Sequence, residues 1–135
     1  MGLTVESTAD REVKIGSVSL DSPYALAPMA GMTDTAFRRL VKRRGGCGLV
    51  VTEMVSSEGL VRGIDRTLEY AEYTEEERPV SIQIFGGDPV TMAEAAKIVE
   101  GMVADIIDVN MGTAPHQHDT LTIISPGSSS SSTSF

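Results

Sequence analysis

Four short apolar runs, each followed by a polar or helix-forming stretch, constrain the fold of this chain more than any other feature. The runs span roughly residues 24–29, 48–53, 80–85 and 104–109. Near-continuous apolar strands that alternate with helices are typical of a parallel sheet whose two faces are both covered. Right-handed crossovers join consecutive strands of such a sheet. We therefore predict an α/β fold with about four parallel strands and intervening helices.

Two architectures accommodate four such strands. The strands form half of an eight-stranded barrel or most of a small doubly wound sheet. No GxGxxG sequence follows the first strand and no P-loop is found, so the usual phosphate-binding turns of doubly wound sheets are missing. We therefore predict a partial TIM (β/α) barrel, in which residues 13–112 form the amino-terminal half.

The first predicted helix follows the first strand. Thr33 is a candidate N-cap, and Gly45 with Gly46 ends the helix. One face is apolar and the far end is basic, comprising Phe37, Leu40 and Val41 on the face and Arg38, Arg39, Lys42, Arg43 and Arg44 at the end. The helix dipole favours cations there, so we interpret the basic cluster as a solvated helix end. Contact with nucleic-acid phosphate is the alternative.

Two further helices are marked by capping signals. Ser56 or Ser57 begins a short one, which Gly63 breaks. Asp88 as N-cap with Pro89 at the first helical position begins a longer one, which ends at Gly101. Its apolar face comprises Met92, Ala95, Ala96 and Val99. The acidic residues 65–77 between these helices, including the glutamate run 75–77, are predicted to form a solvated connection.

The two ends of the chain differ from its centre. Residues 1–12 are polar and predicted to be flexible, and residues 13–20 alternate in polarity as in a short hairpin. Residues 113–135 include an unbroken serine run at 128–132, and only residues 121–124 have a β-like pattern. Low-complexity sequence of this kind is predicted to be disordered.

Charge and cysteine content limit the classes of function. The net charge is −8, which argues against capture of nucleic acid by the chain as a whole, since such capture needs a basic face. Cys47 is the single cysteine, so no intramolecular disulfide forms and a reducing compartment fits. Neither a signal peptide nor an apolar run of about 18 residues is found. We expect a cytoplasmic protein with no membrane association.

Polar and small residues gather where the predicted strands end. Ala30 and Gly31 follow the first strand, Glu53 the second, and Gln83 and Asn110 lie at the ends of the third and fourth. Ligands of alternating β/α folds bind at the carboxyl ends of the strands. An amide side chain offers a donor and an acceptor, which suits the imide-like edge of a flavin or pyrimidine. These residues are equally compatible with ordinary turns and with buried amides that satisfy the backbone.

Four segments together carry a resemblance to a known family. APMAGMTDTAFRRL, LVVTEMVSSEGL, RPVSIQIFGGDPVTMAEAAKIVE and ADIIDVNMG resemble the tRNA-dihydrouridine synthases, over about residues 22–112. The resemblance implies an FMN-dependent enzyme on a TIM barrel, followed by a helical domain that helps to hold tRNA. It implies that NADPH reduces the flavin, which passes hydride to C6 of a uridine flipped out of the tRNA stack. A cysteine of the family then protonates C5.

The resemblance also implies roles for individual residues. Pro28, Met29 and Ala30 would lie against the isoalloxazine, mostly through backbone atoms. Gln83 would hydrogen-bond the flavin ring. Asn110 would lie between flavin and uridine, and would thus contact both cofactor and substrate. Glu53 would orient the neighbouring loop or contribute to the site directly.

The sequence departs from the family pattern after Gly112. Thr113 stands where the family has its acidic cysteine, and a threonine hydroxyl is a far weaker acid than a thiol. Cys47 is no substitute, because it precedes the second strand at the opposite end of the barrel. His116, His118 and Asp119 resemble a metal-binding pattern without a third anchored ligand, so no metal is expected. The family's later flavin ligands, phosphate site and helical domain are not found, and we expect this chain alone to be inactive.

Two other functions remain open from the sequence. One is a different flavin-dependent barrel enzyme, similar to dihydroorotate dehydrogenase, which shares amides and small residues at strand ends. The other is a truncated, noncatalytic product. A half barrel also has open strand edges and an apolar interior, so self-association is expected.

Overall fold

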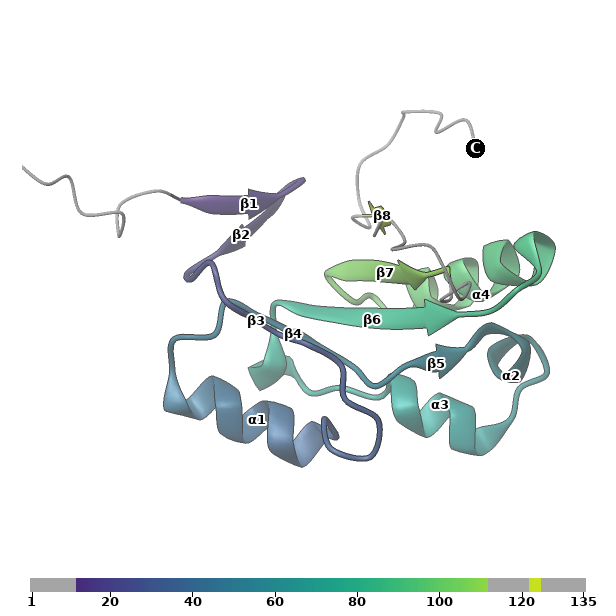
Figure 1. The fold of residues 1–135 in the computed structure, drawn as a ribbon, viewed down its shortest axis with the longest axis horizontal. Helices are drawn as coiled ribbons and strands as arrows, with labels where there is room; N and C mark the ends of the chain where they lie inside the picture. Colours follow the sequence, from purple (N-terminus) through teal and green to yellow (C-terminus); the bar gives the residue numbers. More distant parts are fainter. Residues whose placement is uncertain (1–11, 112–121, 125–135) are drawn as a thin grey trace, which may run out of the picture.

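The computed structural model describes residues 12–111 and the backbone of residues 122–124, which form an α/β arrangement (Figure 1). The elements are, in order, β1 Val13–Ile15, β2 Val18–Leu20, β3 Ala25–Leu26, α1 Thr35–Arg44, β4 Leu49–Val51, β5 Val55–Ser56, α2 Ser57–Val61, α3 Asp65–Ala71, the 3-10 helix η2 Glu75–Glu77, β6 Val80–Phe85, α4 Pro89–Gly101, β7 Ile106–Asn110 and β8 Thr122–Ile124. The helices of the described part of the chain are too short or too polar to cross a bilayer.

The main sheet has the strand order of a barrel wall. β3, β4, β6 and β7 are parallel, and each lies beside the preceding one of the set. A doubly wound sheet would instead reverse its order at a switch point. β5 pairs with the second half of β6, and β8 pairs antiparallel with β7. The predicted partial TIM barrel is confirmed for the described residues.

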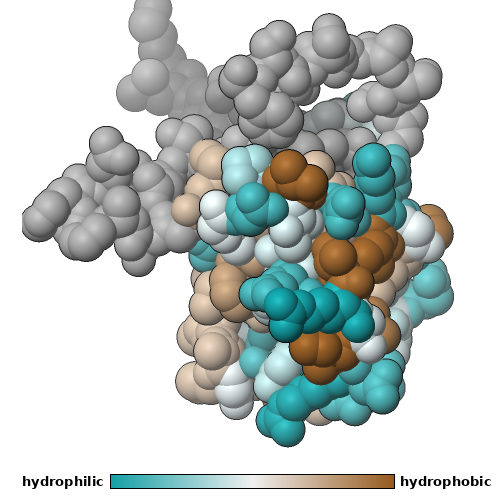
Figure 2. Space-filling model, turned by 90° about the vertical axis from the view of Figure 1, so that its right-hand side faces the viewer, coloured by the Kyte–Doolittle hydropathy of each residue, from teal (hydrophilic) through white to brown (hydrophobic). Residues whose placement is uncertain are grey.

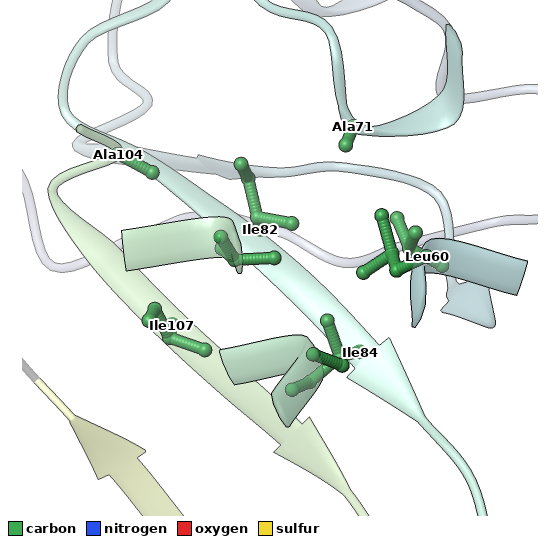
Figure 3. Packing of buried hydrophobic residues seen from close by; sticks show 9 residues of the cluster. Leu60, Ala71, Ile82, Ile84, Ala104 and Ile107 are labelled. Carbon is green, nitrogen blue, oxygen red and sulfur yellow. The ribbon is translucent and has the colours of Figure 1, made fainter. Parts of the chain in front are cut away.

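Strand register divides the sheet into two faces with different chemistry. Ser81 lies opposite Ile106, and Gln83 opposite Asp108, so these four side chains share one face. The alternate residues point to the other face, where α2 and α4 cover them (Figure 3). The core there comprises Val55, Leu60, Ala71, Ile82, Ile84, Ala95, Val99, Ala104 and Ile107. Each fully buried isoleucine contributes about 1.5–3 kcal/mol, so this face holds the sheet to its helices.

The hairpin β1–β2 packs at the amino ends of the strands. Leu20 of β2 is buried against Leu49 and Ile106, the first residues of β4 and β7. Both of these residues lie on the face opposite the helices. The hairpin predicted at residues 13–20 is confirmed, and it closes that face at the end remote from the strand tips (Figure 1).

Helix α4 begins where its local signals predict. The Asp88 carboxylate accepts a hydrogen bond from the backbone N of Thr91 at 2.8 Å, and Pro89 is the first helical residue. Ala95 and Val99 are fully buried in the core, as the predicted apolar face requires. Ser56 likewise caps α2, accepting from the backbone N of Gly59 at 3.2 Å. Both starts follow from local chemistry alone.

The start of α1 corrects a prediction. Asp34, rather than Thr33, is the N-cap, since its carboxylate accepts from the backbone N of Phe37 at 2.8 Å. The Thr33 hydroxyl is fully buried in the preceding loop, where the backbone of Met29 engages it. Leu40, predicted to lie on the apolar face, has 63% of its surface exposed.

The acidic connection was also predicted wrongly. Residues 65–77 form α3 and η2, and Ala71 and Glu77 are buried. Tertiary contacts rather than local pattern decide this, because Glu77 has a buried cationic partner on α1. β5 was not predicted, since a strand of two residues leaves no periodic signal.

The outer strands are shorter than predicted. β3 comprises only Ala25–Leu26, and Tyr24 is 72% exposed, because β3 lies at the edge of the described sheet. β7 begins at Ile106 instead of residue 104. β8 agrees with the β-like pattern at residues 121–124. The predictions for residues 1–11 and for the remainder of 113–135, with Thr113, His116, His118 and Asp119, lie outside the described residues.

Candidate functional site

A buried amide–carboxylate pair lies in the middle of the sheet. The Gln83 side chain donates from Nε2 to Asp108 Oδ2 at 2.5 Å, directly across from β6 to β7. Each of the two residues has only 6% of its surface exposed. The backbone N of Gln83 donates to Thr52 Oγ1 at 3.2 Å, which ties the pair to the end of β4. Gln83 is therefore hydrogen-bonded to residues beside both neighbouring strands, Thr52 after β4 and Asp108 on β7.

Three buried polar atoms of this face have no hydrogen-bond partner among the described residues. They are Ser81 Oγ, Gln83 Oε1 and Asp108 Oδ1. An unsatisfied buried polar group costs about 1–3 kcal/mol, so such groups are rare unless they serve a purpose. All three lie on the sheet face opposite the helices. A polar ligand on this face would satisfy them.

The Asp108 carboxyl is electrostatically perturbed. Burial raises its pKa above the ordinary value, whereas hydrogen bonds from the Gln83 side chain and the Val109 backbone N lower it. Burial is the largest of these effects. A perturbed carboxyl beside unpartnered acceptors is typical of a functional site.

The loop between β3 and α1 carries the predicted ring-contacting residues Pro28, Met29 and Ala30. The Met29 carbonyl accepts from the backbone N of Thr33 at 3.0 Å, and the Thr33 hydroxyl accepts from the Met29 N at 2.9 Å. Gly31, at a φ of 74°, donates its N–H to Glu53 Oε2 at 2.9 Å. Glu53 therefore orients this loop, which is one of the two roles predicted for it. The adjacent Thr52 joins the loop to Gln83.

Asn110 ends β7 on the same sheet face as Gln83, since Phe85 pairs with Asn110 and Gln83 with Asp108. Its Nδ2 donates to Met54 Sδ at 3.4 Å. The structure thus places both predicted amides on one face near the strand tips. A site that residues 28–30 share with these two amides stays a prediction.

Large apolar side chains at the carboxyl ends of the strands and in the loop after β3 are partly exposed. They are Met29 at 38%, Met32 at 59%, Met54 at 41%, Phe85 at 39% and Met111 at 57%. Figure 2 views the side of the molecule toward which β6 and β7 run, and hydrophobic surface lies there beside hydrophilic surface. Apolar walls around a few fixed polar groups are typical of a small-molecule site. Flexible methionines adapt well to a flat ring.

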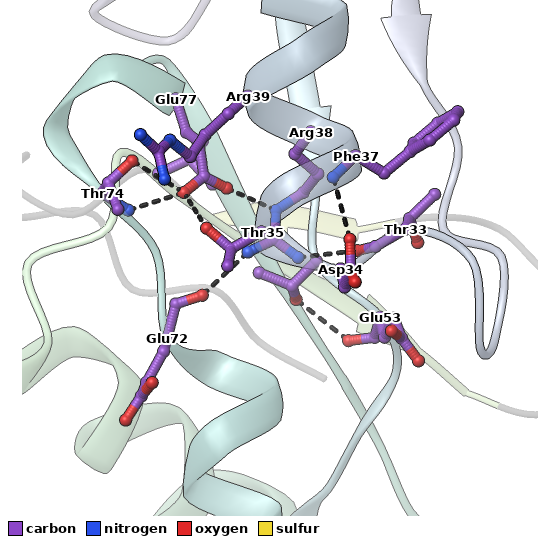
Figure 4. A network of polar contacts seen from close by, with 12 residues as sticks. Thr33, Asp34, Thr35, Phe37, Arg38, Arg39, Glu53, Glu72, Thr74 and Glu77 are labelled. Atoms are coloured by element: carbon purple, nitrogen blue, oxygen red, sulfur yellow. Dashed lines mark hydrogen bonds and ion pairs between the residues drawn. The ribbon is translucent and has the colours of Figure 1, made fainter.

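A buried ionic network contacts the end of the loop between β3 and α1 (Figure 4). Arg38 donates to Glu77 Oε1 at 2.5 Å, to the Thr33 carbonyl at 2.7 Å and to the Glu72 carbonyl at 2.8 Å. Arg38 is 2% exposed and Glu77 is fully buried. The pair fixes the start of α1 against η2 and holds the end of the loop that carries Met29.

This network corrects the interpretation of the basic cluster. Arg38 is buried instead of solvated, and Glu77 is not part of a solvated loop. Arg39 and Arg43 both pair with Glu76. The hydrogen bond from Arg39 is the largest of the effects that lower the pKa of Glu76. Contact between this cluster and nucleic-acid phosphate is correspondingly less favoured.

Cys47 lies immediately before β4, at the amino end of the sheet, as predicted. It is half-buried, and its thiol donates to the Leu49 carbonyl at 3.1 Å. The absence of a metal remains a prediction, because His116, His118 and Asp119 lie outside the described residues.

Sequence reasoning did not assign a role to Asp108 or Ser81. A signal was present, because Ser81 and Gln83 alternate with Val80, Ile82 and Ile84, and Asp108 interrupts an apolar strand. Alternation alone does not show which residues of neighbouring strands lie opposite each other. Only the strand register in the structure shows that Gln83 pairs with Asp108.

Comparison with known proteins identifies the family. The sequence model of the family described as dihydrouridine synthase (Dus) matches residues 25–119. A probable tRNA-dihydrouridine synthase of Rickettsia conorii is 46% identical over 101 residues, which cover 74% of this chain and 30% of the relative. One of Rhodobacter capsulatus is 49% identical over 102 residues, covering 74% and 31%. The tRNA-dihydrouridine synthase B of Pseudomonas aeruginosa is 45% identical over 100 residues, covering 74% and 30%.

The chain therefore spans less than a third of the length of these relatives. The match confirms the resemblance of the four segments, and it includes the strand-end residues 28–31, 83 and 110. The family model covers well over half of the sequence. This chain belongs to the dihydrouridine synthase family.

Proposed function

We propose that this chain is an amino-terminal part of a flavin-dependent tRNA-dihydrouridine synthase and forms the first half of its barrel. The complete enzyme would reduce uridine in tRNA to 5,6-dihydrouridine with NADPH as reductant. The observation that supports this most is the buried Gln83–Asp108 pair with its unpartnered acceptors, on a sheet whose strand ends carry partly exposed apolar side chains. Family membership favours tRNA uridine over the dihydroorotate of a similar flavin enzyme.

The residues at the strand tips fit FMN. A flavin ring system is flat, with two faces that stack on apolar groups and one polar imide edge, and these strand ends offer apolar side chains and buried polar atoms. Gln83 would bind the imide edge, and Pro28, Met29 and Ala30 would lie against the ring. Bound FMN would supply hydride to the uridine ring. Met54 and Phe85 would exclude water from this edge of the sheet.

Asn110 would contact both the flavin and the uridine. Its place at the end of β7, beside Met54, puts it at the rim of the site instead of its floor. An amide there can donate to a uridine carbonyl and accept from its N–H. Glu53 would act indirectly, by holding Gly31 and with it the loop against the ring.

We propose that this chain alone forms no dihydrouridine. Thr113 occupies the position of the general acid, and its hydroxyl does not release a proton at neutral pH. The test is incubation of the purified chain with FMN, NADPH and unmodified tRNA, followed by quantification of dihydrouridine in the hydrolysed tRNA. Any dihydrouridine above that of a chain-free reaction contradicts the proposal.

Cofactor binding is tested separately from catalysis. The visible absorbance spectrum of the purified chain is recorded before and after FMN addition and desalting, with circular dichroism as the test of folding. The wild type is expected to retain flavin, and Gln83→Ala to lose it. Lys97→Ala, on the exposed side of α4, is the matched control and should retain it. A folded wild type without flavin contradicts FMN binding and supports a noncatalytic product.

We further propose a cytoplasmic location and self-association. tRNA modification and the single cysteine fit the cytoplasm. β3 lies at an edge of the described sheet, and exposed backbone groups of an edge strand pair readily with another chain. Size-exclusion chromatography with light scattering tests the second point, and a monomeric mass over a range of concentrations would contradict it.

A further inference from the structure

The orientation of one buried amide decides what the site can recognise. Gln83 donates from Nε2 to Asp108 Oδ2, so its carbonyl Oε1 has no partner among the described residues. The second carboxylate oxygen of Asp108 is likewise unpartnered there. Both side chains are 6% exposed, so bulk water does not substitute for a partner. The two unpartnered oxygens of the pair are therefore both hydrogen-bond acceptors.

An ionised carboxylate can only accept hydrogen bonds. Opposite such a group, Gln83 must direct its NH₂ toward Asp108 and its carbonyl away from it. The reverse orientation would set two acceptors against each other at hydrogen-bond distance in a buried site, where like partial charges are poorly screened. Asp108 thus selects one of the two amide orientations, which differ little in shape.

A site that presents a carbonyl selects a ligand that donates. In the oxidised flavin ring system the N–H donor is N3–H, which lies between two carbonyl acceptors on the imide edge. The Ser81 hydroxyl, on the same sheet face, can either donate or accept, so it is compatible with a neighbouring ligand carbonyl. Gln83 Oε1 and Ser81 Oγ are therefore complementary to the N–H and to one carbonyl of an imide.

We propose that Asp108 is a positioning residue, which fixes the Gln83 amide so that the site selects the imide N3–H of the flavin. This inference rests on the proposed function, because it takes FMN as the ligand. Asp108 itself acts through Gln83. Its role is specificity for a donor on the ligand, beyond general support of the fold.

The central experiment compares FMN with N3-methyl FMN, which lacks the imide donor. Dissociation constants are measured by quenching of flavin fluorescence for the wild type, Asp108→Asn and the control Asp88→Asn. Asparagine at position 108 can donate as well as accept, so both Gln83 orientations become allowed. Asparagine at position 88 is as good a helix cap as aspartate, so the control changes the charge without changing the site.

The wild type should bind FMN about fivefold or more tightly than the N3-methyl analogue, since a buried acceptor left unsatisfied costs at least this factor. Asp108→Asn should weaken FMN binding about tenfold and reduce the preference to about threefold or less. Asp88→Asn should keep both values. The methyl group has the same bulk in every experiment, so a change in preference between variants reports the donor.

A second measurement needs no flavin. The side-chain NH₂ of Gln83 is observed by ¹H–¹⁵N NMR, with Gln83→Ala to assign it. In the wild type we expect slow hydrogen exchange and a downfield proton, because the amide donates to a buried carboxylate. Both signatures should be lost in Asp108→Asn. A fast-exchanging Gln83 amide in the folded wild type would overturn the positioning role even if the variant failed to fold.

The outcomes separate the two proposals. A folded wild type that binds no flavin contradicts the proposed function and, with it, this inference. A wild type that binds FMN and its N3-methyl analogue equally overturns the inference and leaves the proposed function standing. Equal preference in wild type and Asp108→Asn does the same.

Discussion

Glu77→Gln tests whether the buried ionic network holds the site together. Glu77 Oε1 accepts from Arg38 Nε at 2.5 Å, and Oε2 accepts from the Thr35 hydroxyl at 2.8 Å and the Thr74 backbone N at 2.6 Å. The substitution keeps the shape of the side chain and removes its charge. It therefore leaves the Arg38 guanidinium, which is 2% exposed, without a counter-charge.

The expected loss of stability is large. Removing one partner of a buried ion pair costs about 3–5 kcal/mol, because the other charge remains desolvated. A domain of this size has a total stability of about 5–15 kcal/mol, and each kcal/mol shifts Tm by about 4–8 °C. The Tm of Glu77→Gln should therefore fall by about 12 °C at the least. If the stability of the wild type is near the lower limit of this range, the variant will not fold.

Thermal unfolding followed by circular dichroism measures this loss. Glu76→Gln is the matched control, because Glu76 is the neighbouring glutamate and its pairs with Arg39 and Arg43 are solvated. Its Tm should change much less. The double variant Arg38→Met with Glu77→Leu should recover part of the stability lost in Glu77→Gln, since it removes both buried charges. Equal Tm values for Glu77→Gln and Glu76→Gln would refute the reasoning.

Three further changes have definite expected results. Asp108→Asn should raise the Tm of the flavin-free chain at pH 7. Burial raises the pKa of this carboxyl above its ordinary value, so the protonated group favours folding at low pH and this stabilisation is lost as pH rises through the pKa of the folded state. A Tm of Asp108→Asn below that of the wild type at pH 7 would contradict this reasoning. Gly48→Ala should cost about 1–3 kcal/mol in urea unfolding, because a Cβ there overlaps the backbone carbonyl of Ser22. Gly87→Ala, where a Cβ meets open space, is its control and should be near neutral. Glu53→Leu should speed hydrogen exchange of the Gly31 amide, whereas Glu53→Gln retains an acceptor and should preserve protection; equal exchange in the two variants would exclude this role.

Much of the fold is predictable because its signals are local. Asp88 and Pro89 set the start of α4 through a side-chain cap and a fixed φ, and neither depends on distant residues. β6 extends over the predicted residues 80–85, since this central strand is buried from Val80 to Ile84. β3, at the edge, lacks such burial, and its extent was overestimated.

Predictions failed where a distant residue decides the environment. Arg38 and Glu77 are 39 residues apart in the chain, and nothing in the local sequence of either indicates a buried partner. An arginine within a cluster of basic helix residues usually extends into solvent, and a glutamate run usually forms a solvated loop. Their mutual neutralisation makes burial possible, and it anchors η2, which contains Glu77, against α1.

The sequence by itself determined the family, the order of the four parallel strands with helices α1, α2 and α4, and the identity of the amides on the last two of these strands. These depend on composition, periodicity and motif, all of which are one-dimensional. Only the tertiary structure decided that Gln83 lies opposite Asp108, that their free oxygens share a face with Ser81, and that Glu53 holds the loop at Gly31. Register and hydrogen bonding between separate strands create these relations, because they bring together residues that the chain itself keeps apart.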